Sequence, residues 1–175
     1  MTPEQIGASV RAVPDFPSPG ITFRDIGPLL AHPEGFAASV DWLAERVTQS
    51  GATKVAGMEA RGFIFGAAVA RQCNLGFIPI RKPGKIPVET IATAYDLEYG
   101  SNTLELDPTL LNDGEAVAIV DDLIATGGTA VAARDLLHRA GARVNFRGFV
   151  IELTELGGRR HLETMETQVV SLLGF

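Results

Sequence analysis

The chain has 175 residues, a net charge of −6 at pH 7 and a pI near 5.0. This acidic balance argues against a surface built to bind nucleic acid. The sequence contains no signal peptide and no apolar run long enough to span a membrane, so we expect a soluble, cytoplasmic protein without a membrane partner. Its length is that of a single domain, residues 1–175, and its only cysteine, Cys73, excludes an intrachain disulfide.

The N-terminal part is expected to wrap the core before the first regular element. Five prolines within residues 1–30 predict an irregular arm. Apolar residues at helical spacing predict an amphipathic helix over residues 34–49 that ends near Gly51. The elements expected next are a strand over 54–58, a helix over 62–73 and a strand over 77–80.

A long loop rich in proline and glycine follows, and residues 95–98 and 103–106 predict the two arms of a hairpin. We expect residues 82–105 to form a flexible flap that covers a site. The remaining expected elements are a strand over 116–120, a helix over 130–140, a strand over 144–153 and an edge strand near 168–172. This alternation predicts an α/β fold with a mostly parallel central sheet and helices on both faces.

The most informative motif runs from Val117 to Thr129, where an apolar strand leads to Asp121 and Asp122 and then to a loop of threonine and glycine. Side chains at the carboxyl end of a strand lie where open α/β sheets bind their ligands. The loop and the helix N-terminus after it can bind a phosphate. The carboxylates can accept hydrogen bonds from ribose hydroxyls or hold a hydrated Mg²⁺. The spacing alone fits an ordinary strand, turn and helix equally well.

Other nucleotide-binding motifs do not fit the chain. Gly57 and Gly62 have the outer spacing of a P-loop, but Phe63 and Ile64 occupy the positions that require Lys and Ser or Thr. No Gly-x-Gly-x-x-Gly segment opens a helix, and the three histidines have no metal-ligand spacing. Kinase-type and dinucleotide-binding functions are therefore disfavoured.

The thirteen-residue stretch 117–129, Val-Ala-Ile-Val-Asp-Asp-Leu-Ile-Ala-Thr-Gly-Gly-Thr, resembles the signature of the type I phosphoribosyltransferases, which bind 5-phosphoribosyl-1-pyrophosphate (PRPP). Four further segments resemble the adenine phosphoribosyltransferases of that family, in the same order, at 16–26, 57–66, 80–87 and 95–100. The resemblance runs from about residue 11 to the C-terminus. It implies the type I phosphoribosyltransferase fold, in which a flap hairpin and a small hood, made by the N-terminal arm and the C-terminal segment, accompany the sheet.

The implied activity is purine salvage by a glycosyltransferase that moves the phosphoribosyl group of PRPP to adenine, giving AMP and pyrophosphate. The resemblance also implies Mg²⁺ as cofactor, held mainly by PRPP and water with no direct protein ligand, and a homodimer. Two alternatives stay open: another purine phosphoribosyltransferase, such as one for xanthine, and a non-catalytic PRPP-sensing regulator that binds nucleic acid. The acidic pI counts against the regulator.

The resemblance assigns the PRPP site position by position. The 5-phosphate is expected at Ala125, Thr126, Gly127, Gly128 and Thr129, and the ribose hydroxyls at Asp121 and Asp122. The pyrophosphate is expected at Glu59, Ala60, Arg61, Arg81, Lys82 and Lys85, where the family often has a strained non-proline peptide bond in the loop at 59–62. Arg61 is also expected to be catalytic, because its fork of donors suits phosphate oxygens. The last three basic residues fit a solvated turn as well.

The base is assigned to two distant segments. Phe23 matches an aromatic residue that stacks on adenine, Thr22 and Arg24 match positions whose backbone meets the base edge, and Leu153 matches the apolar residue on the opposite face. Glu98 matches the acidic residue that manages the proton on adenine N7, which implies a catalytic role. Without the resemblance, Phe23 fits a core anchor, Leu153 a buried strand residue and Glu98 a solvated flap residue.

Overall fold

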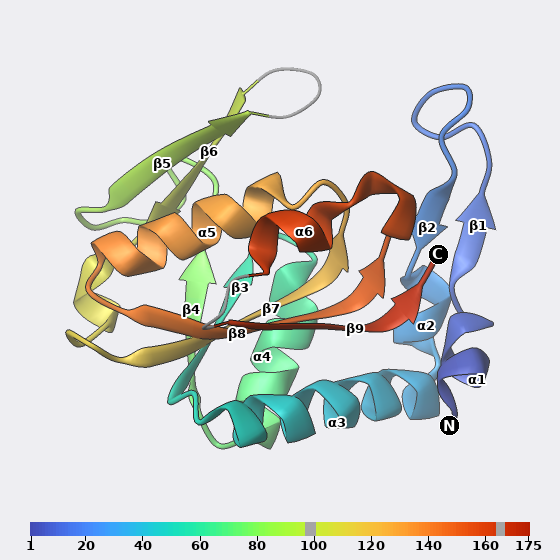
Figure 1. Ribbon diagram of the computed structural model, residues 1–175, viewed down its shortest axis with the longest axis horizontal. Coiled ribbons are helices and arrows are strands. Elements are labelled where there is room, and N and C mark those ends of the chain that lie inside the picture. The colour runs from blue at the N-terminus through green and yellow to red at the C-terminus, as the bar shows by residue number, and fades with distance from the viewer. Residues whose placement is uncertain (97–100, 164–166) are drawn as a thin grey trace.

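The structure, a computed structural model, describes residues 1–96, 101–163 and 167–175. Its centre is a parallel five-stranded sheet (Figure 1). In spatial order the strands are β4 (Gly76–Ile80), β3 (Lys54–Met58), β7 (Ala116–Ile124), β8 (Arg143–Glu152) and β9 (Gln168–Gly174). The sequence prediction of a mostly parallel α/β sheet is confirmed.

Helices cover both faces of this sheet because successive strand residues point to opposite sides. On one face α3 (Pro33–Ser50) and α4 (Gly62–Gln72) pack against Val55, Ala118 and Val120. On the other face α5 (Gly128–Arg139) packs against alternate residues of the same strands. Gly51, with φ of 73°, ends α3 as predicted, since a left-handed backbone conformation suits glycine.

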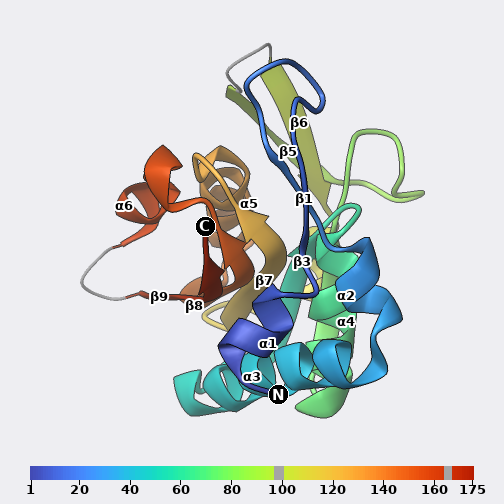
Figure 2. The same ribbon diagram turned by 90° about the vertical axis from the view of Figure 1, so that its right-hand side faces the viewer.

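The segments outside the sheet are short. The N-terminal region contains α1 (Pro3–Gly7), the antiparallel pair β1 (Arg11–Val13) and β2 (Phe23–Asp25), and α2 (Gly27–Ala31). Between β4 and β7 lie the hairpin strands β5 (Ile91–Asp96) and β6 (Ser101–Leu106) and the 3₁₀ turn η1 (Pro108–Leu110). The turn η2 (Thr154–Leu156) and α6 (Gly158–Leu162) separate β8 from β9. Figures 1 and 2 show the two hairpins rising at the same end of the molecule.

Four sequence expectations need correction. Residues 1–30 are not an irregular arm, because β1 pairs with β2 and Arg11 Nε donates to Asp25 at 3.0 Å. The strand expected to end at 120 continues to Ile124, since Asp121, Leu123 and Ile124 keep their pairing with β8. Long-range pairing thus outweighs the low strand preference of aspartate. Helix α5 spans 128–139 rather than 130–140. The hairpin arms begin earlier than predicted, at Ile91 and Ser101, while residues 97 and 98 of the predicted arm 95–98 lie outside the described residues.

The topology places a ligand-binding crevice between β3 and β7. These strands are neighbours, yet α4 follows β3 on one face and α5 follows β7 on the other. In open α/β sheets the loops separate at such a switch point and leave a crevice at the carboxyl ends of the strands.

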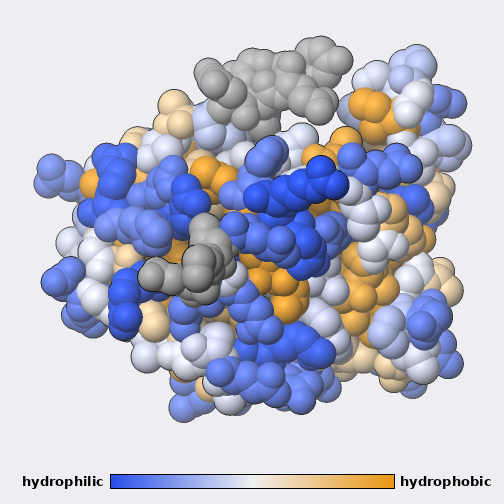
Figure 3. Space-filling view, viewed as in Figure 1, coloured by the Kyte–Doolittle hydropathy of each residue, from blue (hydrophilic) through white to orange (hydrophobic). Residues whose placement is uncertain are grey.

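Hydrophilic side chains predominate on the molecular face of Figure 3, where apolar patches interrupt them. Within the described ranges, no helix is both long and apolar enough to cross a membrane.

Candidate active site

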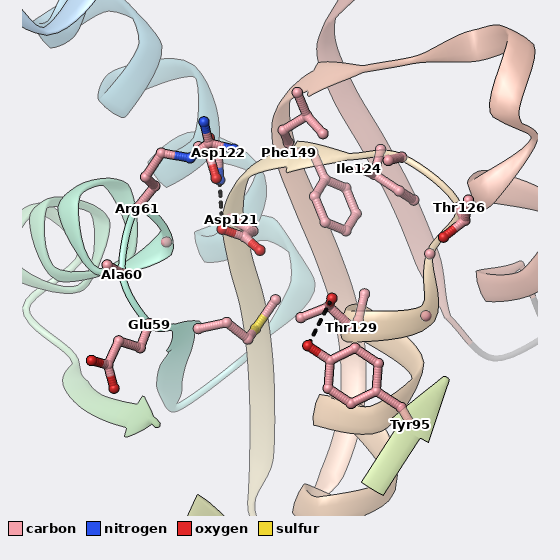
Figure 4. Close-up of a pocket in the computed structure, with 17 residues that line it drawn as sticks. Glu59, Ala60, Arg61, Tyr95, Asp121, Asp122, Ile124, Thr126, Thr129 and Phe149 are labelled. Atoms are coloured by element: carbon pink, nitrogen blue, oxygen red, sulfur yellow. Dashed lines mark hydrogen bonds and ion pairs between the residues drawn. The ribbon is translucent and has the colours of Figure 1, made fainter. Parts of the chain in front are cut away.

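A cavity of about 300 Å³ occupies the predicted crevice (Figure 4). Its walls are residues 58–62, from β3 and the start of α4, and residues 121–130, from the end of β7 and the start of α5. Tyr95 of β5 and Phe149 of β8 complete the lining. The cavity therefore brings together Glu59, Ala60 and Arg61 with both aspartates and the whole 125–129 loop, as the sequence motifs predicted.

The two carboxylates lie almost entirely inside the protein, at 9% exposure for Asp121 and 4% for Asp122. The backbone N–H of Asp122 donates to Oδ1 of Asp121 at 2.8 Å. Burial, together with the adjacent charge of Asp122, raises the pKa of the Asp121 carboxyl well above its usual range. Burial also raises the pKa of Asp122, and the nearby Arg61 guanidinium opposes this shift. The pair is therefore costly to ionise until a ligand supplies hydrogen-bond donors.

Arg61 connects the carboxylates to the N-terminal hairpin. Its Nε lies 2.9 Å from Oδ2 of Asp122, an atom that accepts no well-directed hydrogen bond within the described residues. Its guanidinium also lies 5.5 Å from the ring centroid of Phe23 on β2. Because 41% of the Arg61 side chain remains exposed, the guanidinium is accessible to an anion at the mouth of the cavity.

The 125–129 loop has the backbone geometry of an anion site. Gly127 adopts φ of 87° and caps α5 without any side-chain hydrogen bond to the first turn. The first turn of this twelve-residue helix contains no acidic residue. Its unpaired N–H groups and the positive end of the helix dipole therefore face the loop, where a phosphate is favoured.

The segment after β4 is tied to the loop after β3. Glu59 precedes a cis peptide bond to Ala60, in agreement with the unusual non-proline bond expected at this loop. Its Oε2 accepts from the backbone N–H of Lys82 at 3.1 Å and from Nε of Arg81 at 3.2 Å. The hydrogen bond from the Lys82 backbone lowers the pKa of Glu59 most, and the contacts with Arg81 lower it further. Arg81 also donates to the carbonyl of Lys85 at 3.0 Å.

The structure places the other predicted residues around the cavity rather than in its wall. Arg81, Lys82 and Lys85 are not among the described residues that line it, although Glu59 ties their segment to the site. The predicted base residues also lie outside the lining, at Thr22, Phe23, Arg24 and Leu153. Glu98 lies outside the described residues. The cavity thus contains the predicted phosphate and ribose positions but only part of the predicted pyrophosphate set.

The predicted base residues form contacts of their own. Phe23 is half-buried and packs edge-to-face on Phe16, with ring centroids 5.2 Å apart. The Arg24 guanidinium lies 4.1 Å from the ring centroid of Phe175. The backbone N–H of Leu153 donates to the carbonyl of Ile124 at 2.9 Å, which fixes Leu153 next to the end of β7. This region is linked to the cavity by the contact of Arg61 with Phe23 and by the bond of Leu153 to Ile124, which lines the cavity.

Sequence reasoning missed several lining residues, among them Tyr95 and Phe149, which come from strands outside the two site segments. Tyr95 approaches the phosphate loop from the hairpin, and its hydroxyl lies 3.4 Å from Oγ1 of Thr129 (Figure 4). Phe149 has the pattern of any buried strand residue, so the sequence offered no signal for it. The position of Tyr95, three residues before Glu98 on the predicted flap, was a usable signal.

Removing the buried charge of Asp121 is expected to stabilise the ligand-free protein. Folding raises the pKa of this carboxyl, so the folded state keeps its proton where the unfolded chain has lost it. Wild-type stability therefore falls as the pH rises through the raised pKa, whereas asparagine does not titrate. We expect Asp121→Asn to raise the Tm at pH 8 by about 3 °C, or about 1 kcal/mol in a domain of this size. The difference should shrink toward pH 4, as calorimetry at several pH values can measure.

Asp41→Asn is the matched control for this stability measurement, because Asp41 is exposed on α3 and accepts a hydrogen bond from the Gln72 side chain at 3.2 Å. Its Tm should stay within about 1 °C of wild type at each pH. A lower Tm for Asp121→Asn at pH 8 would contradict the cost assigned to the buried charge.

The Asp121 carboxylate occupies the space in which a side chain at Gly62 would lie. A Cβ at Gly62 would lie 2.5 Å from Oδ1 of Asp121, so Gly62→Ala must displace this carboxylate. For the PRPP site that the sequence resemblance implies, we expect the variant to raise the KM for PRPP at least about tenfold, because misplacing one charge-assisted hydrogen bond costs about 1.5–3 kcal/mol. Gly76→Ala is the control, since the nearest atoms to its Cβ would be those of the flexible Lys54 side chain, at 3.6 Å or more. Equal KM values for both variants would show that the carboxylate position is unimportant.

Comparisons with known proteins identify the class of this fold and site. Residues 25–153 match the phosphoribosyl transferase domain family. The adenine phosphoribosyltransferase of Novosphingobium aromaticivorans is 58% identical over 175 residues, which are 100% of this chain and 98% of the relative. That of Pectobacterium atrosepticum is 49% identical over 98% of this chain and 93% of the relative.

Solved structures agree with the sequence relatives. The adenine phosphoribosyltransferase of Thermoanaerobacter pseudethanolicus superposes with a TM-score of 0.95 at 42% identity, over 99% of this chain and 100% of the other. That of Saccharomyces cerevisiae, solved with adenine and an iminoaltritol bisphosphate, has a TM-score of 0.91 at 35% identity, over 98% of each chain. The chain belongs to the adenine phosphoribosyltransferase family.

Proposed function

We propose that this protein transfers the 5-phosphoribosyl group of PRPP to N9 of adenine, forming AMP and releasing pyrophosphate in purine salvage. The observation that supports the proposal most strongly is the crevice between β3 and β7. There the N-terminus of α5, which is suited to bind a phosphate, lines one cavity of about 300 Å³ together with two buried carboxylates and an accessible arginine. The relatives that carry the adenine phosphoribosyltransferase name match essentially the whole chain.

In the proposed arrangement the 125–129 loop binds the 5-phosphate through its backbone N–H groups and the threonine hydroxyls. Asp121 and Asp122 accept hydrogen bonds from the ribose hydroxyls. These hydroxyls supply the donors that water would supply to an exposed carboxylate. Arg61 turns from Asp122 to the pyrophosphate, while Arg81, Lys82 and Lys85 add positive charge beside Glu59. Donors and positive charge would thus follow the anionic groups of PRPP from the 125–129 loop in the cavity to the basic segment beside it.

Adenine is proposed to stack between Phe23 and Leu153, with the backbone at Thr22 and Arg24 meeting the edge of the base. As N9 bonds to C1′, the C1′–O bond breaks, its electron pair leaves with pyrophosphate, and the purine loses one proton. Cationic character on the ribose and negative charge on the leaving group make positioning and electrostatics the main sources of catalysis. Glu98, on the proposed flap, would share the proton at N7.

The donor set also fits Mg²⁺. Oδ2 of Asp122 is a buried carboxylate oxygen that lacks a directed hydrogen bond within the described residues, and hard oxygen donors suit this ion. Asp121 and Asp122 would hold it mainly through water and the ribose hydroxyls. When bound, Mg²⁺ neutralises charge on the pyrophosphate. Among the described residues no group of three or more His, Cys, Asp or Glu side chains could form a metal site by itself.

The organisation that we propose around this reaction is a single domain, residues 1–175. Residues 1–30 and the C-terminal segment form a hood over the base, and residues 82–105 form a catalytic flap that excludes water during transfer. We further propose a cytoplasmic homodimer that binds neither nucleic acid nor membrane.

The test is a turnover assay with purified protein, Mg²⁺, PRPP and one base at a time: adenine, hypoxanthine, guanine, xanthine or uracil. Adenine should give AMP and an equimolar amount of pyrophosphate, and the other bases should give almost no nucleotide. Preferential use of another base would refute the substrate assignment. Binding of PRPP without turnover of any base would instead support a regulator.

A further inference from the structure

The loop proposed to bind phosphate separates two hollows. The candidate active site lies on one side, and a second hollow of about 580 Å³ lies on the other, between the hairpin strand β5, α5 and α6. Thr126, Gly128 and Tyr95 line both hollows. Because hollows lie on two sides of the loop, the elements that do touch it directly must hold its peptide groups in place.

Helix α6 supplies one set of these contacts (Figure 1 shows it beside the start of α5). Gly158 lies so close that a Cβ there would be 2.2 Å from the carbonyl oxygen of Ala125 and 2.8 Å from the nitrogen of Gly127. Glycine is required at Gly158 because any side chain would displace the loop backbone. The first residue of α6 therefore rests directly on the loop.

Helix α6 is itself fixed to the sheet. Nε of Arg159 donates to Oε1 of Glu152 at 3.0 Å, and Nη1 donates to the carbonyl of Val169 at 2.7 Å. Leu162 is fully buried in a cluster with Ile124 and Phe149. These contacts fix α6 relative to β8 and β9, so α6 can hold the loop in a defined position beside these strands.

His161 completes the contact between α6 and the loop. Its Nδ1 lies 2.9 Å from the carbonyl oxygen of Thr126. A carbonyl can only accept, so Nδ1 must carry the proton in this hydrogen bond. The C=O and N–H groups of a trans peptide point in opposite directions, so holding the Thr126 carbonyl also fixes the direction of the Gly127 N–H. That N–H belongs to the loop proposed to receive the phosphate.

We propose that His161 is a positioning residue for phosphate binding: by holding the Thr126 carbonyl from outside, it keeps the 125–129 loop in the shape that binds a phosphate monoester. This inference rests on the proposed function of the loop. His161 is exposed and does not line the candidate active site, so it acts through the loop alone. It also differs from the catalytic assignments in that its effect should be confined to the phosphate end of the ligand.

The test compares His161→Ala and His161→Asn with wild type, using calorimetric titration of ribose 5-phosphate and, separately, pyrophosphate. Losing one hydrogen bond should weaken ribose 5-phosphate binding about 3- to 10-fold in His161→Ala. Asparagine presents an N–H near the position of Nδ1, so His161→Asn should stay within about twofold of wild type. Pyrophosphate binding should not change. Arg160→Ala, an exposed neighbour on α6, is the matched control and should bind both ligands as wild type does.

Three results would overturn the proposal: unchanged ribose 5-phosphate binding in His161→Ala, equal loss in the alanine and asparagine variants, or a parallel loss of pyrophosphate binding. The proposed function fails separately, if wild type forms no AMP from adenine and PRPP. In that case the titrations still report whether His161 supports a phosphate site.

Discussion

An Arg61→Ala variant is expected to lose about 10²- to 10³-fold in kcat/KM for PRPP. Arg61 is the cation that contacts the buried carboxylate pair, with Nε 2.9 Å from Oδ2 of Asp122, and it is exposed enough to reach an anionic ligand. Hydrogen bonds between charged groups contribute about 1.5–3 kcal/mol each, and a guanidinium forms two of them with a phosphate. Losing about 3–4 kcal/mol of transition-state stabilisation gives the stated range.

Two variants control for this effect. Arg61→Lys keeps the charge without the fork of donors, so it should recover part of the loss but remain clearly below wild type. Arg71→Ala removes an exposed arginine at the other end of α4 and should keep wild-type kinetics. Steady-state assays over a range of PRPP concentrations measure all three. A loss smaller than about fivefold in Arg61→Ala would remove Arg61 from the mechanism.

Phe23→Ala should raise the KM for adenine by about 10- to 100-fold. Stacking of a base on an aromatic ring contributes about 1–3 kcal/mol, and alanine offers no flat surface. The KM for PRPP should change by no more than about threefold, because Phe23 does not line the cavity and the Arg61 guanidinium approaches its ring only to 5.5 Å. The two constants come from separate titrations of adenine and PRPP.

Phe23→Tyr retains the ring and is the control for Phe23→Ala. Its KM for adenine should stay within about threefold of wild type. A larger increase would show that this side chain does not act by stacking. An alanine variant that weakens PRPP as strongly as adenine would show that Phe23 supports the N-terminal hairpin rather than the base.

The fold was predictable where hydrophobic patterns are local. The strand over 54–58 and the helix ending at Gly51 agree with the structure because a short buried run and a left-handed glycine are encoded within a few residues. The pairing of β1 with β2 was not predictable. Each strand has only three residues, and their register depends on a contact between Arg11 and Asp25, fourteen positions apart.

The site was predictable to the same degree. Asp121, Asp122 and the 125–129 loop lie close together in sequence, so one short motif contains them all, and the topology adds Arg61 from the loop after the neighbouring strand β3. The phosphate loop has a second support that no motif indicates. His161 reaches Thr126 across 35 positions, and only the packing of α6 brings the two together.

A crystal structure of the protein with AMP is the most direct test of the central claim, that the crevice between β3 and β7 binds a phosphoribosyl group and presents it to adenine. We expect the phosphate on the backbone of residues 125–129, the ribose hydroxyls at Asp121 and Asp122, and the adenine between Phe23 and Leu153. AMP bound elsewhere, or bound in this crevice with its base away from Phe23, would contradict the account.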